Sequence, residues 1–314
     1  RANELVSSLG SALQRYFGHG RGLTFYSWTS DQFSQFGTKV IPSTTRDATY
    51  VLDELLRNET ELPLLEHTSD TAGYTEIVFA LFDLLGLRFA PRIRDLGKQT
   101  LYRIEGLDLD GYPHVRNRVQ GLVRREHIVK AWDDLLRVAG SLKLGWVTAS
   151  LLVEKLQRAP KRNALARALQ RYGRLPKTLH ILEWYAEERL RRRVCAMLNK
   201  GEALHALRDY VRHANHGIIR KGGDESLLNE ASCLNLIVNA IIIWNTIYMQ
   251  ATIEQLGIEG FPVKDEDLPH LWPTRYEHIN VHGKVRFRIE ERPRPGELRP
   301  LRVPEPASDL PPLP

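Results

Sequence analysis

One acidic residue, Asp70, stands among small polar residues directly ahead of a strongly apolar segment, in the stretch LEHTSDTAGYTEIVFALFDLLG (65–86). Two interpretations fit this position. Ser, Thr and Asp side chains accept hydrogen bonds from the free N–H groups at a helix start, so Asp70 could be a cap. A carboxylate just beyond a buried strand could instead hold a metal ion, which would need a second acid from a distant part of the chain.

The residues around Asp70 alternate between strand and helix patterns, which predicts an α/β layer with at least one parallel pair of strands. Asp70 would then lie just past the carboxyl end of a buried strand, where open α/β sheets form their sites. This position favours the metal interpretation without deciding it. We expect strands at 22–28, 38–44, 62–67 and 87–93, and helices at 46–58 and 75–86.

Helical periodicity dominates after about residue 94, and no strand is expected between residues 115 and 215. The Pro-rich residues from about 290 lack periodicity, which predicts an extended or disordered tail. Amphipathic or apolar helices are expected at 127–145, 149–159, 163–173, 179–214 and 226–257.

The most apolar run, CLNLIVNAIIIWNTIYM (233–249), is too short and too polar for a membrane span, since it contains three Asn. We interpret it as a buried core helix. Its Asn side chains at 235 and 245 would bond to the backbone or to a site. Helical spacing places four of its side chains in the core: Leu234, Ile237, Ile241 and Trp244.

Composition is typical of a protein with a real core. The chain has 314 residues, of which 42% are apolar, and its net charge of +6 suits a polyanionic partner without proving one. Cys195 and Cys233 form no CxxC pattern, so a cysteine metal site is not expected. Two unpaired cysteines indicate a reduced, intracellular protein. No signal peptide is visible, and a chain that opens on Arg is expected to be a fragment or a processed product.

Six segments resemble the catalytic region of replicative transposases of the Tn-three transposon family, in the same order, between about Arg15 and Arg302. The resemblance implies an α/β, RNase H-like catalytic core, a mixed sheet flanked by helices, with a large all-helical insertion between the second and third catalytic acids. The segments are GRGLTFYSWTSDQF (20–33), TKVIPSTTRDATYVLDELLRNET (38–60), HTSDTAGYTEIVFALFDLLGLRFAPRIRDL (67–96), LNKGEALHALRDYVRHANHGIIRKGG (198–223), NEASCLNLIVNAIIIWNTIYM (229–249) and WPTRYEHINVHGKVRF (272–287).

The resemblance also implies a division of the chain. The expected parts are the first part of the core (1–95), the helical insertion (96–195), a helical completion of the core (196–258), a β-rich segment (259–289) and the tail (290–314).

When the family's catalytic acids are matched to this sequence by position, the second acid corresponds to Asp70. The third acid is best matched by Glu202 in LNKGEALHAL, 132 residues later, with Glu225 and Glu230 as alternatives. The first acid has no match, because no Asp occurs between residues 1 and 22. We expect it to lie just before Arg1, so that this chain alone would hold an incomplete triad.

The implied activity is metal-dependent cleavage at transposon ends, followed by transfer of the freed 3′-OH into target DNA. Two Mg²⁺ ions, for which Mn²⁺ can substitute, would clamp the attacking and leaving oxygens. Asp70 would hold one ion and Glu202 the other. One alternative is a catalytically inactive DNA-binding or assembly fragment, and another is a helical DNA-binding regulator without a sheet.

The implied partners are double-stranded DNA and a second copy of the chain on paired ends. No membrane is involved, and the expected location is the bacterial cytoplasm, at the nucleoid. Tyr112, Trp132 and Trp146 could stack on a distorted base, although helix-spaced aromatics more often belong to cores. The basic runs at 124–125, 159–163 and 191–193 could bind phosphates or be solvated helix faces, and a strand-end His could simply pack. The candidate phosphate contacts are His67, Lys200, Arg220, Lys221, Arg124, Arg125, Arg191 and Arg192.

Overall fold

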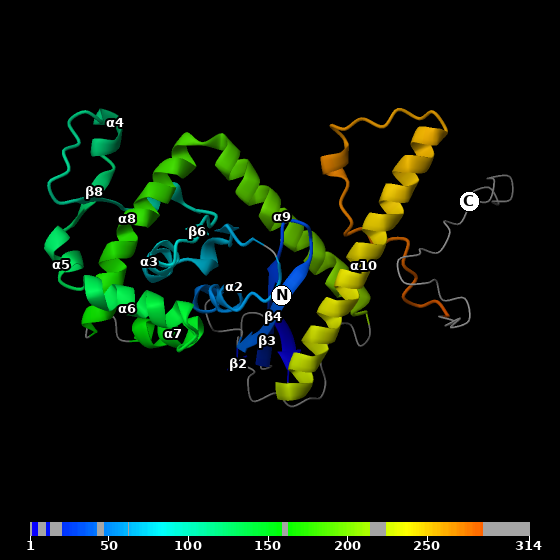
Figure 1. Ribbon diagram of the computed structural model, residues 1–314, viewed down its shortest axis with the longest axis horizontal. Helices are drawn as coiled ribbons and strands as arrows, with labels where there is room; N and C mark the ends of the chain where they lie inside the picture. Colours follow the sequence, from blue (N-terminus) through cyan, green and yellow to red (C-terminus); the bar gives the residue numbers. More distant parts are fainter. Residues whose placement is uncertain are drawn as a thin grey trace.

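Helices and three small sheets make up the part of the chain that the computed structural model describes, namely residues 2–5, 11–12, 21–42, 47–61, 63–158, 163–213 and 224–284 (Figure 1). The architecture is mixed α/β, as the sequence predicts, and mostly helical. The predicted tail at 290–314 lies outside the described residues.

An antiparallel sheet forms the first part of the fold. The central strand β3 (Arg21–Thr29) pairs with β4 (Gln35–Pro42) and with two short strands, β1 (Ala2–Leu5) and β2 (Ser11–Ala12). Trp28 anchors this sheet to the core, since its buried indole N–H donates to the carbonyl of Val51 at 3.0 Å. The strands predicted at 22–28 and 38–44 are therefore confirmed, although β4 begins earlier than expected.

A parallel pair follows, made of β5 (Glu66–His67) and β6 (Arg88–Phe89). Between them run a 3₁₀ turn, η2 (Thr71–Gly73), and the helix α3 (Glu76–Leu84). The predicted strands at 62–67 and 87–93 are thus real but much shorter. The predicted helix at 75–86 is confirmed.

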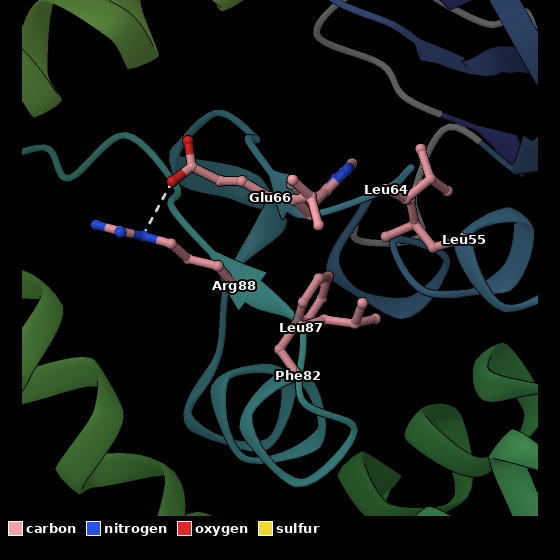
Figure 2. Close-up of a pocket in the computed structure, with 8 residues that line it drawn as sticks. Leu55, Leu64, Glu66, Phe82, Leu87 and Arg88 are labelled. Atoms are coloured by element: carbon pink, nitrogen blue, oxygen red, sulfur yellow. Dashed lines mark ion pairs between the residues drawn. The ribbon is translucent and has the colours of Figure 1, made fainter. Parts of the chain in front are cut away.

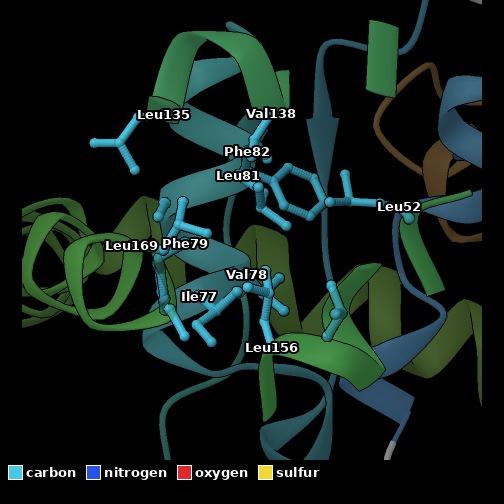
Figure 3. Packing of buried hydrophobic residues seen from close by; sticks show 14 of the residues in the cluster. Leu52, Ile77, Val78, Phe79, Leu81, Phe82, Leu135, Val138, Leu156 and Leu169 are labelled. Carbon is cyan, nitrogen blue, oxygen red and sulfur yellow. The ribbon is translucent and has the colours of Figure 1, made fainter. Parts of the chain in front are cut away.

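Helix α3 lies at the centre of the main core, because residues 77–82 are apolar all round and all buried. Figure 3 shows this helix enclosed by neighbouring helices. The helices that cover it are α6 (Trp132–Lys143), α7 (Ala149–Arg158) and α8 (Ala164–Ala186).

The crossing of α3 and α8 is unusually close at Gly173. A Cβ atom built on Gly173 would lie 1.7 Å from the carbonyl oxygen of Glu76 and 3.1 Å from the nitrogen of Ala80. Only glycine fits there. One turn later, Lys177 extends back across the crossing and pairs with the Glu76 carboxylate at 3.0 Å.

The helix predicted at 46–58 is interrupted in the structure. A 3₁₀ turn, η1 (Asp47–Thr49), precedes a single helical turn, α2 (Asp53–Leu56). The buried carboxylate of Asp53 binds both Lys39 on β4 and the backbone N–H of Ser150 at 2.7 Å. These two contacts tie the segment to β4 and to the start of α7.

The expectation of an all-helical segment at 96–195 is wrong. Strands β7 (Leu101–Ile104) and β8 (Val119–Val123) form a parallel pair there. Both strands are short, and each buries one end residue: Leu101 of β7 in one hydrophobic cluster and Val123 of β8 in another. Such short strands leave no clear periodicity in the sequence. The remaining elements of this part are η3 (Leu96–Lys98), α4 (Pro113–Arg116) and α5 (Arg125–Val129).

The helix boundaries predicted at 173 and 179 are also wrong. Helix α8 continues through both Gly173 and Pro176, and the chain breaks instead at Glu187, whose φ of −110° and ψ of 105° are not helical. Helix α9 (Glu188–Val211) begins there and runs back toward the sheets (Figure 1). Gly173 stays helical because the crossing requires it.

The last helix, α10 (Asp224–Ile258), packs on α9 and β4. By length and composition alone, its residues 226–258 would suffice to span a membrane, and a third of its most apolar window is buried in the fold. Of the predicted core side chains, Leu234 is buried and Ile241 is packed, but Ile237 and Trp244 are largely exposed. For the last two, the expectation is wrong, since apolar residues surround this helix while the fold covers only one side.

After α10 the chain turns back beside it (Figure 1). Asn245 holds this return segment by donating to the carbonyls of Pro273 (2.7 Å) and Arg275 (2.8 Å). Trp272 packs on Phe33, with ring centroids 5.6 Å apart. The predicted β-rich segment is wrong over 259–284, where the described residues form turns and one 3₁₀ helix, η5 (Leu268–His270).

We predict that Gly173→Ala destabilises the fold by about 3 kcal/mol, because the added methyl group must push α8 away from α3. Urea unfolding would measure this loss. Gly140→Ala is the matched control, since that helical glycine has no atom near its absent Cβ. The control should be neutral or up to about 1 kcal/mol more stable, from helix propensity. An equal response of the two variants would contradict the crossing.

Candidate metal and DNA site

Asp70 follows the last backbone hydrogen bond of the parallel pair. The ladder continues past β5 and β6, as Ala90 N–H donates to the carbonyl of His67 (2.9 Å) and Arg92 N–H donates to that of Ser69 (2.8 Å). The exposed Asp70 therefore stands at the carboxyl end of a parallel strand pair, where α/β folds form their sites.

Asp70 makes no side-chain capping hydrogen bond, although it is the residue that precedes η2. The cap of α3 is Thr75, whose hydroxyl accepts from the N–H of Val78 at 3.3 Å. Hydrogen bonding therefore gives the capping interpretation of Asp70 no support. The small residues after it form a tight turn, in which Gly73 N–H donates to the Asp70 carbonyl at 2.9 Å.

A second carboxylate, Asp47 on η1, lies within electrostatic range of Asp70. Burial raises the pKa of Asp47, and the negative charge of Asp70 raises it further. No sequence pattern singles out Asp47, because an acid at the start of an expected helix is ordinary.

Glu202 lies on α9, and its side chain is 76% exposed. The imidazole of His205 lies one turn along the helix, with Nδ1 3.7 Å from the carboxylate. Burial lowers the pKa of His205, and the Glu202 charge partly opposes that shift. The i, i+3 spacing of this pair is a signal that the sequence contained.

Lys200 contacts the turn between β3 and β4. Its ammonium group donates to the carbonyl of Asp31 at 2.7 Å and lies 4.9 Å from the ring centroid of Phe33. It therefore fixes α9 to the sheet near Glu202. Its predicted contact with a DNA phosphate stays a prediction.

An ion-pair cluster ties α9 to the strand that leads to Asp70. Arg193 binds Glu66 on β5 with two hydrogen bonds, of 3.0 and 2.9 Å. Arg88 on β6 pairs with the same carboxylate at 3.0 Å, as Figure 2 shows, and also with Glu183 on α8 at 3.1 Å. A bidentate arginine fixes geometry more firmly than a simple surface pair.

The structure describes the side chain of only one of the two alternative third acids, Glu230. Glu230 is engaged by Arg212, whose guanidinium donates to its carboxylate at 2.9 Å and lies over the ring of Phe25. That contact joins α9 to α10. The side chain of Glu225 lies outside the described residues.

The predicted phosphate contacts have varied surroundings. Arg191 donates to the carbonyls of Trp184 and Tyr185 at the end of α8, so it stabilises the corner between α8 and α9. Arg192 pairs with Glu188 on its own helix. Four further residues fall into two groups: Arg124 and Arg125 are exposed at the start of α5, while Arg220 and Lys221 lie outside the described residues.

His67 is built into the core. Its ring stacks on Phe82 and Phe89, at centroid distances of 5.9 and 6.2 Å, and burial lowers its pKa to about 4. The ring is therefore neutral near pH 7. It also lines a small apolar pocket beside Leu64 and Leu87, drawn in Figure 2. These contacts favour the packing interpretation of His67 over a phosphate contact.

The predicted stacking aromatics are exposed, Tyr112 and Trp146 strongly and Trp132 partly. The alternative, that they belong to the core, is therefore wrong for Tyr112 and Trp146. Their role in stacking on a base stays a prediction.

Carboxylate oxygens are the ligands that Mg²⁺ prefers, so the donor chemistry of Asp70 and Glu202 fits that ion. Within the described ranges, no three or more His, Cys, Asp or Glu side chains are grouped so that they could hold a metal ion. The role of Asp70 and Glu202 as metal ligands stays a prediction.

The family described as Tn3 transposase DDE domain matches residues 6–284. The chain belongs to this family. Its relatives include the transposase for transposon Tn501 of Pseudomonas aeruginosa, 45% identical over 97% of this chain and 30% of the relative. The transposase for transposon Tn21 of Escherichia coli is 45% identical over 93% of this chain and 29% of the relative. The transposase for transposon gamma-delta of Escherichia coli (strain K12) is 37% identical over 95% of this chain and 30% of the relative.

The chain thus spans about a third of the length of the curated relatives it matches. No solved structure matches it. Family membership establishes a DDE-type transposase domain, and this class of domain has an RNase H-like fold.

We predict that His67 makes the fold less stable in mild acid. Its pKa of about 4 lies below the ordinary value of 6.5, so the unfolded chain takes up a proton that the folded chain refuses. Stability should fall as pH drops from about 6.5 toward 4, with His67 responsible for about 2 kcal/mol between pH 7.5 and 5.

Urea unfolding of His67→Phe at the two pH values would measure this contribution, since the variant keeps an aromatic ring but cannot titrate. The exposed His114→Phe is the control and should retain the full pH dependence. An unchanged pH dependence in His67→Phe would refute the assignment.

Proposed function

We propose that Asp70 and Glu202 are the second and third metal-binding acids of a transposase site that cleaves DNA at transposon ends and transfers the 3′-OH into target DNA. The observation that carries this proposal is the position of Asp70, exposed at the carboxyl end of the β5–β6 pair without a capping role. Membership of the DDE-domain family supplies the reaction class.

The Glu66–Arg193 contact places α9 beside the strand that leads to Asp70. Glu202 lies nine residues after Arg193, which is about 13 Å along a helix. Asp70 lies four residues after Glu66, which is about 13 Å along an extended chain. The two segments thus cover similar lengths from one shared contact, while nine residues turn the helix about two and a half times, so Glu202 lies on the face of α9 opposite Arg193.

In the proposed reaction, the Asp70 and Glu202 carboxylates hold hard cations and orient the scissile phosphate between them. Two bound Mg²⁺ ions would supply Lewis-acid stabilisation of the attacking and leaving oxygens. Lys200, fixed beside the site by Asp31 and Phe33, would set the position of α9 and offer charge toward a phosphate.

We further propose double-stranded DNA and a second copy of the chain as partners, in a replicative reaction in the bacterial cytoplasm at the nucleoid. The exposed basic pair Arg124 and Arg125 and the exposed rings of Tyr112 and Trp146 are suited to phosphate contact and base stacking. In this scheme residues 1–95 and 196–258 form the core, and the mainly helical residues 96–195 form an insertion.

A second candidate is an inactive DNA-binding or assembly module, which is compatible with one observation. The described residues form no cluster of three metal-binding side chains. Such a module would keep the fold and bind DNA but would not need either acid.

We predict that Asp70→Asn and Glu202→Gln each reduce strand transfer at least about 100-fold, since a metal-binding acid is lost. The assay would place residues 1–314 in the Tn501 transposase, in place of the matching region, and supply Mg²⁺ and DNA with transposon ends. Glu230→Gln is the matched control, because Arg212 already engages that acid. Full activity of Asp70→Asn would exclude it as a metal ligand.

A second measurement does not depend on activity. Fe²⁺ with ascorbate cleaves a polypeptide near bound metal, so cuts near residues 70 and 202 that Mg²⁺ suppresses are expected from the proposed site. A folded hybrid that binds DNA ends, lacks these cuts and transfers no strand would support the inactive module.

A further inference from the structure

Arg92 lies opposite Asp70 in the register of the parallel strand pair. Glu66 on β5 is paired with Arg88 on β6, an offset of 88 − 66 = 22 residues. Continued along both chains, the same offset pairs Asp70 with Arg92, since 92 − 70 = 22. Residues opposite each other in a ladder place their side chains on the same face of the sheet. The side chains of Asp70 and Arg92 therefore project from one face.

Backbone hydrogen bonds carry this register to the end of the strands. The N–H of Arg92 donates to the carbonyl of Ser69 at 2.8 Å, and the hydroxyl of Thr71 donates to the carbonyl of Arg92 at 3.3 Å. Arg92 is thus bonded to the residues on either side of Asp70. The backbone of Asp70 is extended, with φ of −73° and ψ of 173°. The two residues are direct neighbours across the ladder, where strands lie about 5 Å apart.

The core holds the backbone on both sides of Arg92. The preceding residue, Pro91, is buried, and Nε2 of His180 on α8 donates to its carbonyl at 2.9 Å. The following residue, Ile93, is 5% exposed and belongs to the same hydrophobic cluster as Trp184. Between these two anchors, Arg92 is exposed. A side chain on so firmly held a backbone presents its charge at a defined place.

The guanidinium of Arg92 is not engaged by the described part of the fold. Four residues earlier in the same register, Glu66 and Arg88 form an ion pair of 3.0 Å (Figure 2). Within the described ranges, Arg92 and Asp70 form no ion pair, either with each other or with another residue. Asp70 is one methylene group shorter than Glu66, so its carboxylate stays closer to its own strand. Both charged groups are therefore available to a ligand.

Other basic side chains near the strands and α9 are already in use. Lys200 donates to the carbonyl of Asp31, and Arg191 donates to carbonyls at the end of α8. Arg88 is held by two carboxylates. Arg92 combines an exposed guanidinium with a place beside Asp70, and no basic run marks it in the sequence, because its signal is the register of the strands.

We propose that Arg92 binds the scissile phosphate of the DNA, with its guanidinium on the non-bridging oxygens, at the site where Asp70 holds a cation. The planar fork of N–H donors in a guanidinium matches two oxygens of a phosphate. Negative charge on these oxygens is stabilised best by donors that are already in place when the reaction occurs. Arg92 forms no covalent bond in this role and stays protonated throughout.

This inference rests on the proposed function, which supplies DNA as the substrate and Asp70 as a metal ligand. It adds the residue that holds the reacting group. A carboxylate for the cation and a guanidinium for the phosphate then stand on neighbouring strands, on the same face of the sheet.

The Tn501 hybrid described above tests the contact through Arg92→Gln and Arg92→Lys. In single turnovers at saturating DNA, Arg92→Gln should lower the rate constant of strand transfer about 100-fold. Arg92→Lys keeps the charge without the fork, so its loss should be smaller, about 10-fold. The affinity for DNA ends should change less than about 3-fold, because the contact acts mainly in the transition state and the rest of the hybrid binds the ends.

Arg189→Gln on α9 is the matched control. Arg189 is exposed, has no ion pair within the described ranges, and precedes Glu202 by 202 − 189 = 13 residues. Thirteen residues are about 20 Å along a helix. The control should transfer strands at the parent rate, and an equal loss in Arg189→Gln and Arg92→Gln would show a general effect of charge and overturn the specific contact.

Two measurements separate the contact from metal binding and from folding. Fe²⁺ with ascorbate should still cut Arg92→Gln near residue 70, because the carboxylate is unchanged. Urea unfolding of Arg92→Gln should match that of the parent, because the side chain has no ion pair within the described ranges to lose. A parent-like rate of strand transfer overturns the proposal. So does a loss that is explained by weaker DNA binding, by missing Fe²⁺ cuts or by an unstable fold.

Asp70→Asn, measured beside these variants, distinguishes the two possible failures. Full activity of Asp70→Asn refutes the metal site on which this inference rests. If Asp70→Asn is inactive while Arg92→Gln transfers strands at the parent rate, the metal site stands and only the phosphate contact of Arg92 is refuted.

Discussion

The contact between the backbones of α3 and α8 at Gly173 is the constraint on which most of the fold depends. Helix α3 is apolar on every side, so it is stable only when other elements surround it. Helix α8 covers it at a distance that leaves no room for a side chain. That approach fixes the direction of α8, and through it the corner at Glu187 and the path of α9 back to the strands.

Polar contacts then set how α8 and α9 are aligned with α3 and with the parallel strands. Lys177 and Glu76 lock the crossing on one side, and Arg193, Arg88 and Glu66 lock α9 against the parallel strands. Most of these ion pairs are partly exposed, so each contributes little to stability by itself. Their effect is positional: they determine which turn of α9 stands beside the end of β5.

The sequence predicted the elements with strong periodicity, such as α3 and α10, and the strands β3 and β4. It placed Asp70 correctly past a strand, and the structure decided against capping because Thr75 performs that role. It failed where tertiary contacts override local signals. Gly173 and Pro176 are usual helix breakers but lie inside α8, and β8 is a strand within a helical region. Asp47 and His205 gain their significance only from neighbours that the fold brings near them.

The contacts that hold the return segment at 259–284 lie in its second half: the two hydrogen bonds of Asn245, the Trp272–Phe33 contact, the stack of Tyr276 on Tyr210, the hydrogen bond from the Tyr210 hydroxyl to the Ile279 carbonyl and the stack of His278 on Trp244. Its residues up to 271 are all exposed. A stretch like 259–271, with no buried residue, opens at a lower free energy than the whole domain. Its amide protons should therefore exchange with solvent long before those of α3, and a protease should cut it first while leaving the helical core whole.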